Sequence, residues 1–298
     1  MIRIISRSKR YISSFPILNH ENPLGLPKTQ NSTPLKLNKG LPVKQTIENV
    51  NKIVLVSSGK GGVGKSTIAV NLAAGLKQLG KKVGVLDADI FGPSIPTLLK
   101  LSGEPRLSNE GKLLPLINYG IQSMSMGYLI GSNTPVVWRG LMVMKAIQQL
   151  LFDVKWDNLD ILIVDMPPGT GDVQLSISQQ LKIDGSVIVS TPQDIALIDV
   201  IKGIKMFEKV NIPIFGIVEN MSYYECPNCH HESYIFGKEL NNRAKDLGID
   251  IIGKIPLNPE VSTKSDEGIP LIFSSSNEHL KSSYLQIAKT VDNLLFQS

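Results

Sequence analysis

One stretch decides the fold: Lys52-Ile-Val-Leu-Val-Ser-Ser-Gly59-Lys-Gly-Gly-Val-Gly-Lys65-Ser-Thr67. Residues 52–57 form a short apolar, β-branched run, which is typical of a strand buried on both faces. A glycine-rich turn follows at once, and residues 67–79 then carry apolar side chains at helical spacing. Strand, glycine-rich loop and helix in this order are characteristic of a phosphate-binding loop, and residues 59–66 match its G-x-x-x-x-G-K-[ST] pattern.

This loop predicts the binding of a nucleoside triphosphate, ATP, with Mg²⁺. Backbone N–H groups encircle phosphates only where side chains do not obstruct them, which is why the loop needs glycines. We expect Lys65 to reach the β- and γ-phosphates and Ser66 to hold Mg²⁺ through its hydroxyl. The helix that follows presents its positive N-terminal end to the anion. The predicted nucleotide-binding residues of the loop are Gly59, Lys60, Gly61, Gly62, Val63, Gly64, Lys65, Ser66 and Thr67.

A second strand, at residues 82–87, ends in an acid, as the positioning of metal and water in a P-loop enzyme requires. Asp87 and Asp89 are two residues apart, so in an extended segment they project to the same side. We expect Asp89 to orient the attacking water and Asp87 to contribute to the nucleotide and Mg²⁺ site. The alternative is that each aspartate caps the helix after its strand.

A third strand, at residues 160–165, ends at Asp165, where an acid of the Walker B type would bind Mg²⁺ through water. Residues 169–171 follow it as Gly-Thr-Gly, and we expect this segment to sense the γ-phosphate as a switch loop. Helix capping explains one such acid as well as catalysis does. Three of them in one P-loop chain favour the functional interpretation.

Strand-like and helical patterns alternate along the rest of the chain. Alternation predicts an α/β fold, a doubly wound and mostly parallel sheet with helices on both faces. In such folds the ligand lies at the carboxyl ends of the strands. The further apolar runs are at 186–190, 212–218 and 249–255, and the helical patterns are at 141–151, 173–181, 195–209, 237–247 and 278–295.

The 298-residue chain has a formal net charge of +5, and most of this excess has one local source. Arg3, Arg7, Lys9 and Arg10 supply it, and no acid precedes Glu21. The body of the protein is therefore close to neutral, without the basic patch that binds nucleic acid. No apolar run approaches the roughly 18–20 residues of a membrane-spanning helix, so we expect no stable membrane insertion.

The composition of the N-terminus predicts import into an organelle. Basic residues spaced among isoleucine, tyrosine, phenylalanine and serine, without acids, are typical of mitochondrial leaders. Residues 1–18 therefore predict a targeting leader and a location in the mitochondrial matrix, with a basic cytosolic tail as the alternative. Residues 19–46 are rich in proline, asparagine, threonine and lysine and are expected to form an extended linker. The ATPase domain would span 47–298.

Lys60 is an additional lysine inside the phosphate loop, and it identifies a subgroup. Residues 60–67, Lys-Gly-Gly-Val-Gly-Lys-Ser-Thr, resemble the deviant Walker A motif of the septum-site, plasmid-partition and nitrogenase-iron-protein ATPases. In those MinD-like enzymes the signature lysine reaches across a dimer to the partner's nucleotide. The resemblance therefore implies a homodimer with ATP at its interface, in which Lys60 acts in trans.

Five further segments are informative: Asp87–Ser94, Val137–Gly140, Asp165–Asp172, Ser190–Gln193 and Cys226–Cys229. Together they resemble the Mrp/ApbC family of iron–sulfur carrier ATPases, and the likeness extends from about Leu41 to the C-terminus. With a matrix-type leader it points to the mitochondrial members, which serve the assembly of respiratory complex I. The resemblance thus implies delivery of clusters to apo iron–sulfur proteins, complex I subunits among them. It also implies that Asn220 and Pro256, each just after a strand, contact adenine; a turn-forming role is the alternative for Asn220.

Cys226-Pro-Asn-Cys229, within the loop at 223–231, places two thiols on one turn. This spacing is shared by zinc sites, redox disulfides and iron–sulfur clusters. A redox pair belongs at a strand-to-helix turn, and the C-x-x-C-H pattern completed by His230 needs a haem pocket, so both interpretations are disfavoured. Zinc held with the help of His230 and His231 stays an alternative, although both histidines are more typical of surface polar residues.

A four-iron cluster needs four thiolates, and the chain has two cysteines in total. Two chains related by a twofold axis would together supply Cys226 and Cys229 to one bridging [4Fe–4S] cluster per dimer. This agrees with the dimer that Lys60 implies, and a cluster at an interface is exposed enough to be transferred.

The sequence therefore predicts a slow ATP hydrolase of the matrix that carries a labile cluster. Two alternatives stay open: a zinc-stabilised, ATP-binding assembly chaperone, and a MinD/ParA-like positioning ATPase that binds membrane or DNA. The second has little support, because residues 284–296 carry a single lysine and an apolar stripe suited to packing on the domain.

Overall fold

The computed structural model describes residues 44–130, 140–226, 228–229, 231–238, 240–274 and 276–297. The leader predicted at 1–18 and the linker up to residue 43 lie outside the described residues. Gln45 already pairs with the domain, since its N–H donates to the carbonyl of Gln180 at 2.7 Å and its carbonyl accepts from the N–H of Lys182. Ile47 is buried in the core.

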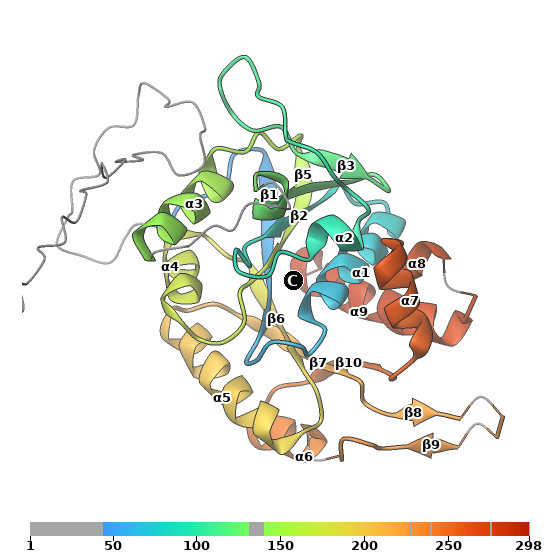
Figure 1. Ribbon diagram of the computed structural model, residues 1–298. Helices are drawn as coiled ribbons and strands as arrows, with labels where there is room; N and C mark the ends of the chain where they lie inside the picture. Colours follow the sequence, from blue (N-terminus) through green and yellow to red (C-terminus); the bar gives the residue numbers. More distant parts are fainter. Residues whose placement is uncertain are drawn as a thin grey trace, which may run out of the picture.

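Within the described part of the chain, eight strands form one sheet in the order β10-β7-β6-β1-β5-β2-β4-β3 (Figure 1). All neighbours are parallel except β3, which pairs antiparallel with β4. The central position of β1 brings the loop after it between the ends of its neighbours β5 and β6. The strands are β1 (Val50–Ser58), β2 (Val83–Asp87), β3 (Leu116–Asn118), β4 (Ile121–Ser125), β5 (Leu159–Asp165), β6 (Gly185–Ser190), β7 (Ile214–Asn220) and β10 (Ile251–Ile255).

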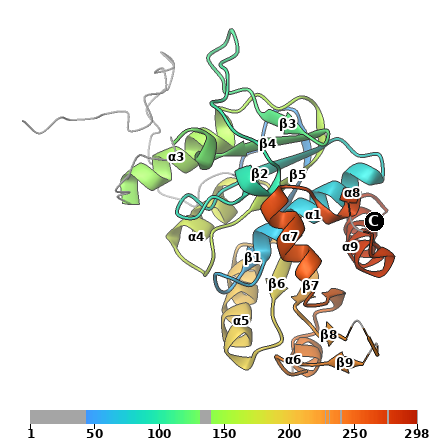
Figure 2. The same ribbon diagram turned by 45° about the vertical axis from the view of Figure 1, so that its right-hand side comes forward.

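Helices cover both faces of this sheet, which confirms the predicted doubly wound α/β fold (Figures 1 and 2). One face packs against α3 (Gly140–Phe152), α4 (Asp172–Gln180), α5 (Asp194–Lys209) and α6 (Leu240–Asp246). The other packs against α1 (Lys65–Gln78), α2 (Ile95–Leu98), α8 (Leu271–Ser274) and α9 (Glu278–Phe296), with α7 (Pro259–Glu267) against α2 and α8.

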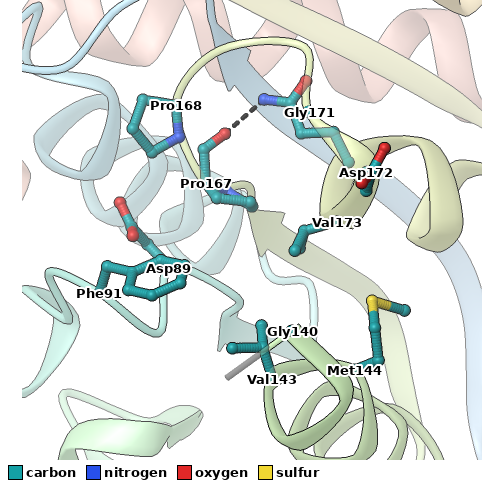
Figure 3. Close-up of a pocket in the computed structure, with 11 residues that line it drawn as sticks. Asp89, Phe91, Gly140, Val143, Met144, Pro167, Pro168, Gly171, Asp172 and Val173 are labelled. Atoms are coloured by element: carbon teal, nitrogen blue, oxygen red, sulfur yellow. Dashed lines mark hydrogen bonds between the residues drawn. The ribbon is translucent and has the colours of Figure 1, made fainter. Parts of the chain in front are cut away.

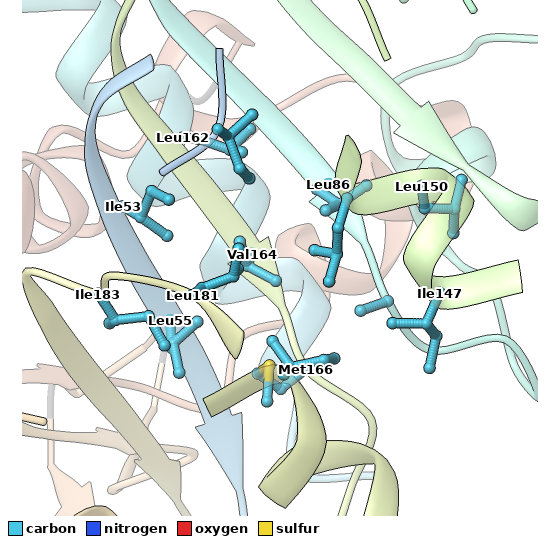
Figure 4. Close-up of a cluster of buried hydrophobic side chains, with 14 of the residues drawn as sticks. Ile53, Leu55, Leu86, Ile147, Leu150, Leu162, Val164, Met166, Leu181 and Ile183 are labelled. Carbon is cyan, nitrogen blue, oxygen red and sulfur yellow. The ribbon is translucent and has the colours of Figure 1, made fainter. Parts of the chain in front are cut away.

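The alternation of side chains along β1 shows how both faces are buried. Ile53 and Leu55 belong to the apolar core under α3 to α6, whereas Val54 and Val56 belong to the core under α1 and α9. Figure 4 shows the first of these cores, with Leu86 on β2 and Leu150 on α3 among its members. Burying each such side chain contributes about 1.5–3 kcal/mol relative to leaving it in water. Because both faces are apolar, the polar residues of the strands gather at their ends.

The C-terminal helix α9 packs on α1, as its apolar stripe predicts. Its buried residues recur at helical spacing, and the helix begins after Asn277, whose side chain accepts a hydrogen bond from the N–H of Leu280. The two helices approach closely, because a Cβ on Gly75 of α1 would lie 2.7 Å from the Cβ of Ala288. Among the described helices none is both long and apolar enough to cross a membrane.

Several elements have no counterpart among the predicted ones: the short helices α2, α7 and α8 and the strands β3, β4, β8 (Tyr224–Glu225) and β9 (Glu232–Ser233). The strands β3 and β4 extend the sheet beyond β2, and β4 leads into a 3₁₀ turn at Met126–Tyr128. The short hairpin of β8 and β9 leaves the sheet after β7, at the end of the molecule where α6 lies (Figures 1 and 2). This hairpin carries the two cysteines.

Candidate functional site

The phosphate-binding loop joins β1 to α1 at the carboxyl edge of the sheet. Gly62 and Gly64 have φ values of +79° and +83°, a left-handed conformation that favours glycine. A Cβ added at Gly61 or Gly62 would meet no atom within 4 Å, so open space lies above the loop. No side chain caps the N-terminus of α1. The loop thus presents unobstructed backbone N–H groups and a positive helix end toward that space, which suits phosphates.

Lys65, Ser66 and Asp165 form one buried constellation. The Nζ of Lys65 lies 2.5 Å from Oδ1 of Asp165, and the hydroxyl of Ser66 donates to Oδ2 of the same carboxylate at 2.5 Å. Asp165 is fully buried, and burial raises its pKa although the ammonium of Lys65 opposes that shift. The three residues bring together a cation, a hydroxyl and a carboxylate at the point where the phosphates of a nucleotide would end.

These groups fit ATP with Mg²⁺. Lys65 would supply the cation for the β- and γ-phosphates, Ser66 would supply the hydroxyl ligand of Mg²⁺, and Asp165 would supply the carboxylate behind that ion. The sequence predicted all three roles, and the structure brings the three residues together.

Asp87 lies deeper than the sequence suggested. It is fully buried, opposite Asp165 in the register of β2 and β5. Its carboxylate accepts hydrogen bonds from the N–H groups of Asp89 and Ile95 and from the hydroxyl of Ser125, at 3.0–3.3 Å. Asp87 therefore holds the turn after β2 through these hydrogen bonds, and its contribution to the nucleotide and Mg²⁺ site stays a prediction.

Burial, with the nearby charge of Asp165, raises the pKa of Asp87 to about 8. Between about pH 5 and pH 8 the folded protein therefore keeps a proton on Asp87 that the unfolded chain releases. As the pH rises through this range, the free energy of unfolding falls by up to about 1.4 kcal/mol per pH unit. Asp87→Asn is expected to remove this part of the slope. Urea unfolding of both proteins at a series of pH values checks it; parallel curves for the two proteins would contradict the assignment.

A pocket of about 490 Å³ lies beside this constellation, between the turn after β2, the loop after β5 and the start of α3 (Figure 3). Asp89 and Phe91 line one side, and Val143 and Met144 of α3 line the other. The walls are largely apolar, and Asp89 stands at their edge as a carboxylate available to water. Its role in orienting the attacking water stays a prediction.

The loop after β5 is fixed at both of its ends. The N–H of Gly169 donates to the carbonyl of Ser58 at 2.9 Å, which ties the loop to the phosphate-binding strand. The buried side chain of Gln174 on α4 donates to the carbonyl of Pro167. The predicted γ-phosphate sensor at 169–171 is thus tied to β1 through Gly169 and is flanked by the contact between Pro167 and Gln174.

Lys60 has a partner that the sequence analysis missed. Its Nζ lies 3.7 Å from a carboxylate oxygen of Asp199 on α5, and Lys202 contacts the same residue at 3.0 Å. These cations lower the pKa of Asp199. Gly59 explains the proximity, because a Cβ there would lie 2.5 Å from the Cβ of Asp199. No local motif marks Asp199, since only the packing of α5 on the loop makes it a neighbour.

Asn220, at the end of β7, contacts the phosphate-binding loop. Its buried Nδ2 donates to the carbonyl of Val63 at 2.8 Å, and a Cβ on Gly64 would lie 2.2 Å from that nitrogen. Pro256 is buried just after β10. Contact of either residue with adenine stays a prediction, whereas the support that Asn220 gives to the loop is part of the structure.

The cysteines lie in the turn between β8 and β9. The N–H of Cys226 donates to the carbonyl of His231 at 3.1 Å, which closes the turn. Cys226 is half-buried, Cys229 is exposed, and neither forms a disulfide. Within the described residues no three histidine, cysteine, aspartate or glutamate side chains gather into a metal site. His230 and residues 131–139, with Trp138 and Arg139, lie outside the described part of the chain.

Strand β1, the glycine-rich loop, α1 and the carboxylate at the end of β5 define a nucleotide-binding P-loop NTPase. The chain belongs to the family of NUBPL iron-transfer P-loop NTPases of the ParA class, whose model matches residues 49–292.

The similar proteins agree with this membership. The iron-sulfur cluster transfer protein NUBPL of Mus musculus is 52% identical over 258 residues, which are 86% of this chain and 81% of the mouse protein. The iron-sulfur protein required for NADH dehydrogenase of Arabidopsis thaliana is 49% identical over 254 residues, 85% of this chain and 81% of the plant protein.

Solved structures of similar proteins have the same fold. A nucleotide-binding protein of Archaeoglobus fulgidus, solved in complex with ADP, is 40% identical and has a TM-score of 0.67, covering 76% of this chain and 90% of its own. The cell division ATPase MinD of Pyrococcus furiosus has a TM-score of 0.60 at 19% identity, with coverage of 82% and 99%. The second likeness concerns the fold alone.

Proposed function

We propose that this protein is an ATP-dependent iron–sulfur cluster carrier of the mitochondrial matrix. The observation that carries the proposal is a C-x-x-C turn on an exposed hairpin, joined by six residues to a strand end that contacts the phosphate-binding loop. Membership of the iron-transfer family supports it. The cargo is a labile [4Fe–4S] cluster.

The nucleotide site suits slow hydrolysis of ATP. When bound, Mg²⁺ supplies charge that neutralises the phosphates. Lys65 binds the β- and γ-phosphates, Ser66 and Asp165 support the ion, and Asp89 orients the attacking water at the pocket edge. Residues 169–171 respond to the γ-phosphate, because they are tied to Ser58 at the base of the loop.

The carrier acts as a homodimer in this proposal. Two cysteines per chain give four thiolates per dimer, the number that one bridging [4Fe–4S] cluster requires. Lys60 would exchange its contact with Asp199 for the phosphates bound by the partner subunit. The contact is weak enough for this exchange, since both side chains are partly exposed and 3.7 Å apart.

The location and the clients follow from the leader composition and the relatives. The basic, acid-free N-terminus supports import into mitochondria. The plant relative is described as required for NADH dehydrogenase. We therefore propose apo iron–sulfur subunits of respiratory complex I as the recipients, with no nucleic-acid or membrane partner.

Iron, acid-labile sulfide and zinc analysis of anaerobically purified protein tests the proposal. About two iron and two sulfide per chain are expected, and none in the Cys226→Ser, Cys229→Ser variant. Zinc without sulfide would overturn the carrier function and favour a zinc-stabilised, ATP-binding assembly chaperone. Sedimentation with liposomes and with DNA is expected to recover the protein in the supernatant; pelleting with either would favour a positioning ATPase.

A further inference from the structure

A short segment, residues 220–226, connects the phosphate-binding loop to the cysteine turn. It begins at Asn220, the last residue of β7, and ends at Cys226, the first residue of the turn between β8 and β9. We call it the strap. Six peptide bonds separate its ends, so a displacement of Asn220 reaches Cys226 through a short length of chain.

The first anchor of the strap is the phosphate-binding loop itself. Asn220 donates from Nδ2 to the carbonyl of Val63 at 2.8 Å, and the same nitrogen packs against Gly64, where a Cβ would lie 2.2 Å away. Val63 stands between two glycines in left-handed conformation. The Val63 carbonyl shares one peptide plane with the N–H of Gly64, so a phosphate that holds this N–H also holds the carbonyl. Because Asn220 is bonded to the Val63 carbonyl and lies close to Gly64, a change in the orientation of that carbonyl alters the contact that Asn220 makes.

The second anchor is the end of β10. The N–H and the hydroxyl of Ser222 both donate to the carbonyl of Ile255, at 2.9 and 3.1 Å, and the carbonyl of Tyr223 accepts from the N–H of Leu257 at 2.7 Å. Between the two anchors Met221 has a φ of +55°, a left-handed conformation that non-glycine residues rarely adopt. A residue keeps such a backbone conformation only where the surrounding contacts fix it. Met221 is therefore the position about which the strap would bend.

We infer that Asn220 is a positioning residue that couples the nucleotide to the cysteines through the strap. This inference rests on the proposed function and names the residues through which the nucleotide site would affect the cysteine turn. Phosphate binding fixes the carbonyl of Val63, the strap becomes ordered through Asn220 and Met221, and the turn that holds Cys226 and Cys229 fluctuates less. By linkage, a cluster held in that turn would change the affinity for the nucleotide by the same factor.

Thiol labelling of metal-free protein tests the coupling, because the chain has two cysteines and both lie on the turn. N-ethylmaleimide labelling is followed by intact mass, with and without saturating ADP and Mg²⁺, at a concentration where the chain is monomeric. ADP is expected to slow labelling of the unaltered protein about fivefold, the lower end of measured allosteric couplings. In Asn220→Ser and Asn220→Asp the effect should fall below twofold, at ADP concentrations that saturate each variant.

Asn118→Ser is the matched control. Asn118 also donates from Nδ2 to a backbone carbonyl at 2.8 Å, that of Leu99, but it lies at the opposite edge of the sheet on β3. It should retain the full ADP effect. Ser222→Ala leaves the phosphate-binding loop untouched and is expected to weaken the effect, which keeps the test valid should the Asn220 variants fail to fold.

Two results would overturn the inference: an unaltered protein whose labelling ignores ADP, or an ADP effect that Asn220→Ser leaves intact. Neither result bears on whether the protein carries a cluster, since neither iron nor sulfide is present in this assay. Conversely, absence of iron and sulfide from the purified protein would remove the proposed function without changing the labelling rates.

Discussion

The Lys65→Ala protein is expected to lose nucleotide affinity by about 100-fold or more, the equivalent of about 2.7 kcal/mol. The reason is that Lys65 is the cation of the phosphate site, buried and 2.5 Å from Asp165. Titration calorimetry with ADP and with ATP in the presence of Mg²⁺ measures this loss. Lys65→Arg is the appropriate comparison, since it keeps the charge in a larger and planar group.

The same substitution is expected to destabilise the fold by about 3–5 kcal/mol at neutral pH, because it leaves Asp165 buried without its cation. The loss should shrink as the pH falls: burial raises the pKa of Asp165, and protonation removes the unpaired charge. Adding Asp165→Asn should restore most of the stability and none of the nucleotide binding. A Lys65→Ala protein as stable as the original at every pH would contradict the buried ion pair.

The rate of cluster transfer by the Lys65→Ala protein tests whether ATP binding and cluster transfer are coupled. If nucleotide state alters the dimer and its hold on the cluster, a protein that cannot bind ATP should transfer its cluster to an apo acceptor at a different rate. Transfer at an unchanged rate would show that the ATPase and the carrier work independently.

Sequence reasoning succeeded where a function needs a contiguous motif. The strand, loop and helix of residues 52–79, the acid at the end of β5 and the layered α/β fold follow from local patterns, because consecutive residues perform one task. The constellation of Lys65, Ser66 and Asp165 was predictable for a different reason. Parallel strands end at one edge of the sheet, so the acid after β5 lies near the loop after β1.

The parts that sequence reasoning missed depend on packing between distant segments. Asp199 lies on a helix with no motif, and it meets Lys60 only because Gly59 lets α5 approach the loop. Asp87 and Asp89 are two residues apart in the sequence, and only the packed fold shows that Asp87 is fully buried and accepts three hydrogen bonds. The contact of Asn220 with Val63 spans 157 residues, and no local pattern reports such a contact.

A mixed dimer is expected to show whether the cluster bridges two chains. Co-expression of the unaltered chain and the Cys226→Ser, Cys229→Ser chain, each with its own affinity tag, allows the heterodimer to be purified through both tags in turn. Such a dimer contains two thiolates, whereas a [4Fe–4S] cluster requires four. After anaerobic reconstitution it should therefore hold almost no iron or sulfide, although half of its chains have intact cysteines.

The alternative arrangements predict a different number. If each chain held its own metal in the turn at 226–231, as a zinc site would, the heterodimer would retain half the metal of the unaltered dimer. A dimer of two unaltered chains with different tags, purified in the same way, gives the reference value. A heterodimer with half the metal content of the reference would contradict the bridging cluster. It would show that the cysteine turn binds metal without a contribution from the partner subunit. Near-zero occupancy would make the twofold axis part of the metal site, since neither chain then holds the cargo without the other.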